Sequence, residues 1–146
     1  MLNRWEKQTG FTIVELLIVI VVIGILAAIT IVAFNGVQNR ANDSRRDSDL
    51  KQLKTALEMY KADKDIYPAV CSADNSGCSV SSLAAELSPT YIASVPQDPK
   101  FPSVGYSYVR GSAGASYGIW VRYDAKPTCK TGVNVNTGWW GTVPLC

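Results

Sequence analysis

Residues 10–34 read GFTIVELLIVIVVIGILAAITIVAF, and Glu15 is followed there by nineteen residues without another charge. The run is long enough to cross a bilayer, which takes about 20 apolar residues. An ionised side chain in hydrocarbon costs about 2.5–3.5 kcal/mol even on the most lenient scale, so Glu15 needs a partner. No lysine or arginine lies between Lys7 and Arg40 to supply one.

A cut between Gly10 and Phe11 would create the missing partner. The new α-amine of Phe11 would be mostly protonated at neutral pH, because free α-amines titrate near ~7.7–8.0. It would lie about one helical turn from Glu15, or beside the Glu15 of a neighbouring copy. Glu15 can also be interpreted more simply, as a carboxylate favoured by the dipole at the start of a helix.

The stretch Gly10-Phe11-Thr12-x-x-Glu15, followed by LLIVI and later by GILAA, resembles the class III signal of type IV pilins and type II secretion pseudopilins. This resemblance implies that a prepilin peptidase, an aspartic enzyme of the membrane, cleaves after Gly10 and N-methylates Phe11. It also implies that Glu15 directs docking of subunits into a filament. The mature protein would then comprise residues 11–146.

The segment before the apolar run carries Arg4 and Lys7. A positive leader predicts that the N-terminus stays in the cytoplasm and that the rest of the chain is exported. Residues 26–40 contain no A-x-A site of an ordinary secretory signal. The remaining alternative to peptidase cleavage is an uncleaved signal anchor.

Composition excludes several classes of function. The chain has 146 residues, a net charge of +2 and no histidine. A net charge this small does not indicate a nucleic-acid-binding surface. The lack of histidine excludes Ser-His and Cys-His catalytic pairs and most types of catalytic zinc site. The sequence therefore predicts a protein that is not an enzyme and that needs no metal or other cofactor.

Residues 12–64 are predicted to form one long helix, since proline is absent from Met1 through Tyr67. The first half, residues 11–34, would lie in the membrane or in a filament core. The second half, residues 35–66, would be exported and amphipathic, with an apolar stripe at Leu50, Leu53, Leu57 and Tyr60. Gly24 and Asn35-Gly36 are the weak points, where the helix could bend or, at Gly24, pack closely.

The polar stretch 38–49 is predicted to be a solvated neck, with Arg45 paired to Asp49 and Asp47 to Lys51 along the helix. Because acidic residues alternate with the basic ones, we interpret this zone as a solvated face and not as a site for lipid or DNA. The basic residues concerned are Arg40, Arg45, Arg46, Lys51 and Lys54.

Residues 67–146 are predicted to form a small globular head. A short helix is expected at 80–87, capped by Ser79, and strands at 105–110, 116–124 and 132–139. An antiparallel meander of three or four strands laid on the helix gives an α+β fold, and the resemblance makes it pilin-like. Trp139-Trp140 could form an exposed adhesive tip, but we favour aromatic packing in the core.

Four cysteines lie in the exported part, which favours an oxidising compartment and two disulfides. We favour the nearest-neighbour pairs Cys71–Cys78 and Cys129–Cys146, the second of which would contribute roughly 3 kcal/mol in the chain-entropy model. A zinc site made of all four cysteines is the alternative, although their spacings are not those of CxxC pairs.

The resemblance extends beyond the apolar run. Residues 50–68 look like the end of the long helix in the major pseudopilin, and residues 91–108 look like that family's entry into its sheet. Asp124 is the only acidic residue after Asp98, so the calcium loop of that family is not carried over. The segment from Cys129 to Cys146 instead looks like the disulfide-bounded region of type IV pilins.

The leading hypothesis is a structural subunit of a type IV pilus-like filament. The alternatives are a type II secretion pseudopilin, or a minor or competence pilin that binds DNA or a surface. The resemblance implies a protein that crosses the cytoplasmic membrane once and ends in a filament at the cell surface or in the periplasm. Its partners would be copies of itself and other pilins, the peptidase, an inner-membrane assembly platform and, before assembly, membrane lipid; nucleic acid is not expected.

Overall fold

The computed structural model describes residues 10–146, which fall into two compact units. One unit ends at Val37, and the other, here called the head unit, runs from Gln38 to Cys146. The predicted leader, residues 1–10, lies outside the described residues except for Gly10.

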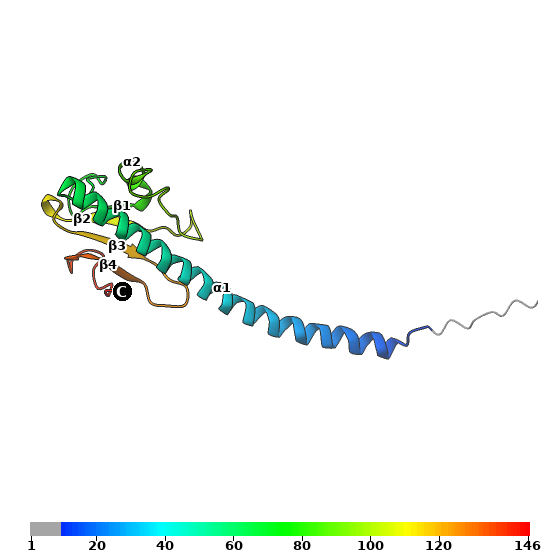
Figure 1. The fold of residues 1–146 in the computed structure, drawn as a ribbon. Coiled ribbons are helices and arrows are strands. Elements are labelled where there is room, and N and C mark those ends of the chain that lie inside the picture. The colour runs from blue at the N-terminus through cyan, green and yellow to red at the C-terminus, as the bar shows by residue number, and fades with distance from the viewer. Residues whose placement is uncertain (1–9) are drawn as a thin grey trace, which may run out of the picture. The chain divides into compact units, whose positions relative to one another are not determined.

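Helix α1 runs without interruption from Ile13 to Lys64, which confirms the predicted helix to within one residue at its start (Figure 1). No proline breaks the hydrogen-bond ladder, and neither Gly24 nor Asn35-Gly36 ends the helix. The first half is apolar and long enough to cross a membrane by length and composition.

The head unit contains one four-stranded antiparallel sheet in the order β1-β2-β3-β4. A 3-10 turn, η1 (Val80–Leu83), and helix α2 (Ala84–Leu87) follow β1, and Ser79 caps η1 as predicted. A second 3-10 turn, η2 (Ser112–Gly114), joins β2 to β3. The strands are β1 (Gly77–Ser79), β2 (Ser107–Arg110), β3 (Tyr117–Val121) and β4 (Cys129–Val133).

One strand prediction was wrong, and one strand was missed. The predicted strand at 132–139 is instead β4 at Cys129–Val133, because the five residues of β3 are fully paired between Cys129 and Val133. The chain then turns at Asn134, whose φ is 48°. Strand β1 was missed, since its three residues are too short a run to show an alternating pattern.

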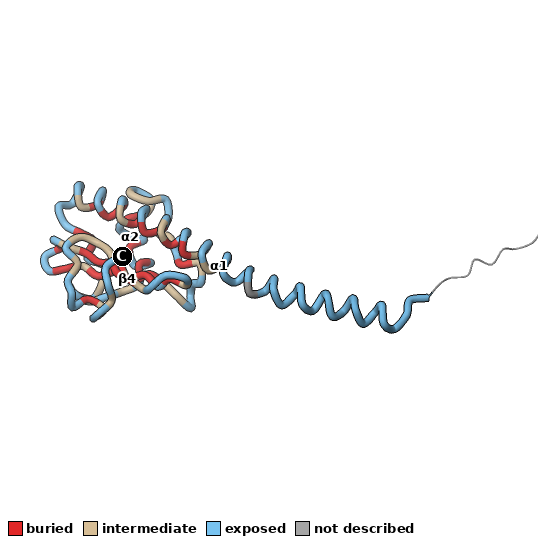
Figure 2. The backbone as a smooth tube through the Cα atoms, turned by 90° about the horizontal axis from the view of Figure 1, so that it is seen from below, coloured by how far each residue is buried: buried red, intermediate tan, exposed pale blue. Residues whose placement is uncertain are grey.

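The core lies between the later half of α1 and the sheet, where Figure 2 shows the buried positions of the head unit. The predicted stripe is confirmed: Leu53 and Leu57 have no exposed surface, and Leu50 and Tyr60 are 6% and 9% exposed. They pack in one cluster with residues of the sheet and of α2, among them Leu83, Leu87, Tyr108, Ile119 and Val121.

The predicted solvated neck was wrong at its centre, because Asp43, Arg46 and Asp49 are buried. The Arg46 guanidinium donates to Asp98 at 2.7 and 3.0 Å, to Asp43 at 2.8 Å and to Asp124 at 3.0 Å. Asp43 also accepts the backbone N–H groups of Asp124 and Ala125, both at 2.8 Å. The partners beyond α1 come from loops far away in the sequence.

The expected pairs along the helix are absent from the ion pairs of residues 10–146. Asp47 pairs with Lys126 and accepts the Tyr123 hydroxyl at 2.6 Å. Three further tyrosines donate to carboxylates of α1: Tyr106 to Asp49 at 2.8 Å, Tyr67 to Glu58 at 3.0 Å and Tyr91 to Asp63 at 2.6 Å. Hydroxyls of the head therefore hold α1 along its length from Asp47 to Asp63.

Trp139 is 7% exposed, which excludes it from an adhesive tip. It packs across the sheet at Gly118, where an added Cβ would come within 3.0 Å of both Trp139 and Trp140. Its indole N–H donates to Asn75 at 3.1 Å. Trp139 thus fastens the C-terminal segment over the sheet, as the core-packing interpretation expects.

We predict that Arg46→Ala destabilises the head by about 3–5 kcal/mol, because it leaves buried carboxylates without their cation. The matched control is Arg45→Ala, an exposed neighbour whose loss should change stability by no more than about 0.5 kcal/mol. Denaturant unfolding of the full chain in detergent, followed by near-UV circular dichroism, measures both. Equal losses would contradict the assigned role of Arg46.

We also predict that the head loses stability in acid. Burial alone would raise the pKa of the Asp124 carboxyl, but hydrogen bonds from Lys100 and Arg46 outweigh it and lower the pKa to about 2. The pKa of Asp43 is lowered as well, against its burial, by the backbone N–H groups of Asp124 and Ala125. Unfolded Asp titrates near ~3.9, so this stabilisation is complete above that pH and is lost as pH falls toward 2.

The melting temperature of the full chain should therefore fall between about pH 4 and pH 2. Asp124→Asn should lower the melting temperature at neutral pH. It should also reduce the slope with which the melting temperature falls between about pH 4 and pH 2. Asp65→Asn, which changes an exposed carboxylate without an ion pair among residues 10–146, should leave the slope unchanged. A slope unaffected by Asp124→Asn would show that other groups cause the acid loss.

Candidate processing and assembly site

Gly10, Phe11 and Thr12 precede the first residue of α1 and are neither helical nor buried. An added Cβ on Gly10 would meet nothing within 4 Å, and Phe11 is 86% exposed. A peptidase needs an accessible, non-helical backbone at the bond it cuts. The Gly10–Phe11 bond meets this requirement in the described chain.

Thr12 and Glu15 form a capping box at the start of α1. The Thr12 backbone N–H and hydroxyl donate to the Glu15 carboxylate at 2.8 and 2.7 Å, and the Glu15 N–H donates to the Thr12 hydroxyl at 3.2 Å. The T-x-x-E spacing is the known signature of this arrangement, which satisfies backbone donors that the helix leaves unpaired. This spacing is visible in the sequence, but the sequence analysis interpreted Glu15 through its charge alone and missed the cap.

The capping box has two consequences for the candidate site. It fixes the helix start after Thr12, so that Gly10 and Phe11 stay outside the helix. It also gives the Glu15 carboxylate local hydrogen bonds before any amine exists at Phe11. Phe11, Glu15, Leu16 and Val19 together line a hollow of about 410 Å³.

The helical residues that follow carry a nearly uninterrupted exposed apolar surface. Leu16, Ile20 and Ile25 are between 56% and 60% exposed, and Phe34 is 66% exposed. Apolar patches of this extent mark contact with a membrane or with other protein surfaces. The only charge in this part of the described chain is Glu15.

The four cysteines form the disulfides Cys71–Cys78 and Cys129–Cys146, the pairs that the sequence analysis favours. No thiolate is left for the alternative zinc site. Within residues 10–146 no group of three histidine, cysteine or acidic side chains converges as a metal site.

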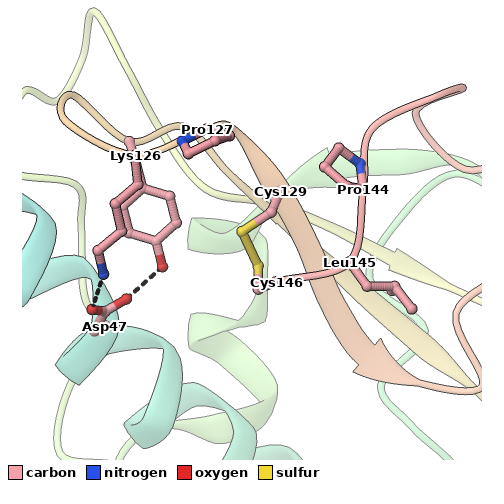
Figure 3. A pocket seen from close by; sticks show the side chains of 8 residues that line it. Asp47, Lys126, Pro127, Cys129, Pro144, Leu145 and Cys146 are labelled. Carbon is pink, nitrogen blue, oxygen red and sulfur yellow. Dashed lines mark hydrogen bonds and ion pairs between the residues drawn. A yellow bond between two sulfur atoms is a disulfide. The ribbon is translucent and has the colours of Figure 1, made fainter.

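A groove of about 400 Å³ lies beside the Cys129–Cys146 disulfide in the head unit (Figure 3). Asp47 closes one end by its contacts with Lys126 and Tyr123, and Pro127, Pro144 and Leu145 line the rest. Its two charged side chains, Asp47 and Lys126, form an ion pair with each other.

These features define a class of protein: a pilin-like α+β subunit whose apolar helical start carries one acidic residue. The prokaryotic N-terminal methylation motif matches residues 5–31. The core protein G of the Escherichia coli type II secretion system is 32% identical over 144 residues, which cover 93% of each chain. The chain belongs to the family of type II secretion system core protein G.

Other relatives, among them the two that follow, share this name. That of Vibrio cholerae is 37% identical over 67 residues, which span 46% of each chain. That of Klebsiella michiganensis is 34% identical over 100 residues, covering 66% of this chain and 70% of its own. No solved structure matches the chain significantly.

The family favours one of two expectations over the other. The relatives are secretion core proteins, so the comparison favours the pseudopilin alternative over the type IV pilus that the sequence analysis ranked first. The family is one of structural subunits, and the protein is therefore not an enzyme.

We predict that Thr12→Ala loosens the helix start while Thr12→Ser preserves it, since serine keeps the capping hydroxyl. Loss of the cap costs about 1 kcal/mol, which corresponds to roughly five-fold faster amide exchange at Glu15. Hydrogen exchange of the full chain in micelles, read by NMR, measures this. Thr30→Ala, at a helical threonine farther along, should leave the Glu15 amide unchanged.

Proposed function

We propose that the protein is a pseudopilin subunit of a type II secretion filament, cleaved after Gly10, N-methylated at Phe11 and polymerised through the start of α1. The observation that carries this proposal is Glu15, the one carboxylate at the head of an exposed apolar run, five residues after an accessible glycine. The family supports the secretion system as the setting.

The first step is cleavage in the membrane. Before it, the capping box with Thr12 supplies hydrogen bonds to Glu15 but no compensating charge. Cleavage converts the Phe11 amide into an ammonium group, and N-methylation keeps that charge. The new cation can then neutralise a carboxylate in an apolar environment, where an unpaired charge is costly.

The second step is assembly. A growing filament offers a Glu15 without a cation in its core, and the amine of an incoming subunit neutralises it. Apolar side chains of α1 pack against copies displaced along an axis. Such a heterologous contact gives a helical filament when the rotation does not close.

The orientation follows from the leader. Arg4 and Lys7 keep the N-terminus in the cytoplasm, and the head unit is exported to a compartment where both disulfides can form. The partners are the prepilin peptidase, an inner-membrane assembly platform, lipid before assembly, and other pilin subunits afterwards.

Intact-mass spectrometry of the protein from native membranes tests the processing. We expect the loss of residues 1–10, one added methyl group on Phe11, and a deficit of four hydrogens for the two disulfides. A chain that keeps residues 1–10 in cells with an active prepilin peptidase would be an ordinary signal-anchored protein, and the proposal would be wrong.

Glu15→Gln separates the charge of this residue from its capping role, because glutamine also completes a capping box. We expect normal cleavage but at least about ten-fold fewer sheared filaments, since 1.4 kcal/mol already corresponds to that factor and an unpaired buried charge costs more. Glu86→Gln, an exposed carboxylate of the head, is the matched control. Wild-type assembly of Glu15→Gln would exclude the proposed pairing.

A further inference from the structure

Lys130 of β4 is a buried lysine without an acidic partner in the described chain. It is 4% exposed, and it belongs to no ion pair among residues 10–146. Its ammonium group donates instead to three backbone carbonyls, those of Trp139 at 2.7 Å, Thr137 at 3.1 Å and Gly141 at 3.2 Å. Because an ammonium group has three N–H donors, each donor has one carbonyl. Lysine is almost never buried unless it is paired, and here carbonyl oxygens take the place of a carboxylate.

The three carbonyls belong to one turn, at residues 136–141. Two backbone hydrogen bonds shape it, from the Trp139 N–H to the Asn136 carbonyl at 3.2 Å and from the Gly141 N–H to the Gly138 carbonyl at 3.5 Å. The backbone is left-handed at Gly141, where φ is 59°. Three alternate carbonyls of the turn point to one place, the ammonium group. Converging backbone carbonyls are a common way in which proteins bind cations.

Lys130 also holds the end of the chain through its backbone. Its N–H donates to the Pro144 carbonyl at 2.9 Å, and its carbonyl accepts the Cys146 N–H at 3.0 Å. The last residues therefore lie beside β4, where Leu145 forms a parallel bridge with Lys130 (Figure 3). One residue thus fixes both the turn that carries Trp139 over the sheet and the segment that follows it.

The resemblance to the major pseudopilins suggests calcium as an alternative cation for this segment, but the oxygens present do not fit a calcium ion. Calcium takes about 6–8 oxygen ligands, carboxylates among them. Residues 125–146 contain no acidic side chain. Asp124, which precedes them, accepts hydrogen bonds from Lys100 at 2.8 Å and Arg46 at 3.0 Å. The turn therefore offers neutral oxygens, which suit a single positive charge held by hydrogen bonds.

We infer that the carbonyls of Thr137, Trp139 and Gly141 form a site for one ammonium group, which Lys130 fills from within the chain. The lysine supplies the cation as a covalent part of the protein, so the C-terminal segment folds over the sheet without a dissolved metal ion. A tethered cation stays bound whatever the salt around the head contains, whereas binding of a free ion depends on its concentration. The inference concerns the head unit and does not depend on filament assembly.

NMR of the ¹⁵N-labelled full chain in detergent micelles tests the site without a substitution. Rapid exchange with water removes the proton signals of exposed lysine ammonium groups, whereas a buried, hydrogen-bonded group is protected. We expect a protected Lys130 ammonium signal, assigned by its absence from Lys130→Ala, that is the same in a chelator and in calcium chloride. A calcium ion that displaces this signal, or a wild-type chain without it, would overturn the inference.

Chemical rescue of Lys130→Ala tests the site from the other side. This variant leaves the buried Trp139 carbonyl without its donor, so we expect the Trp139 amide to exchange at least about ten-fold faster. Propylammonium matches the atoms removed and should restore most of the protection. Tetramethylammonium at the same concentration carries the charge but no N–H donor and should not.

Lys51→Ala is the matched control, because Lys51 is an exposed lysine without an ion pair in the part of the chain that the structure describes. It should leave exchange of the Trp139 amide unchanged. Equal exchange in the two variants would contradict the role of Lys130. Equal responses of Lys130→Ala to the two cations would show that the carbonyls form no ammonium site.

Discussion

The head unit depends on one guanidinium group. Arg46 has no exposed surface, and its hydrogen bonds reach carboxylates of α1 and of two loops, at Asp43, Asp98 and Asp124. Asp43 in turn holds the backbone that follows β3. A buried charge is tolerated only when it is paired and hydrogen-bonded, so the loops must return to this point of the helix. That requirement fixes the position of α1 on the sheet more specifically than its apolar stripe can.

The same helix must satisfy two different surroundings. From Asp43 onward its inner side is covered by the head, through apolar packing and tyrosine hydroxyls that donate to its carboxylates. Before Val37 the apolar side chains that the structure describes are uncovered in the single chain. A membrane covers them before assembly and neighbouring copies afterwards in the function we propose. Glu15, the single carboxylate of that segment, needs a cation in the membrane and in the filament alike. The transfer of the segment from membrane to filament is therefore favourable only when such a cation is available.

The sequence predicts what local patterns determine. The absence of proline and the spacing of Leu50, Leu53 and Leu57 predict α1 and its buried side, and Ser79 predicts the cap of η1. It does not predict that Arg46 is buried, because its partners Asp98 and Asp124 are 52 and 78 residues away. The limits of β4 depend on pairing with β3, which is equally non-local. At the candidate site, Gly10, Phe11 and Glu15 follow from the sequence, and the capping role of Thr12 was a readable local signal that we missed.

The central claim is that the amine freed at Phe11 neutralises Glu15 in the assembled filament. Solid-state NMR of filaments labelled with ¹⁵N at Phe11 and ¹³C at the Glu15 carboxylate measures the distance between the two groups through their dipolar coupling. The account predicts a separation of about 4 Å or less, the range of an ion pair. Intact, correctly processed filaments without such a coupling would contradict it.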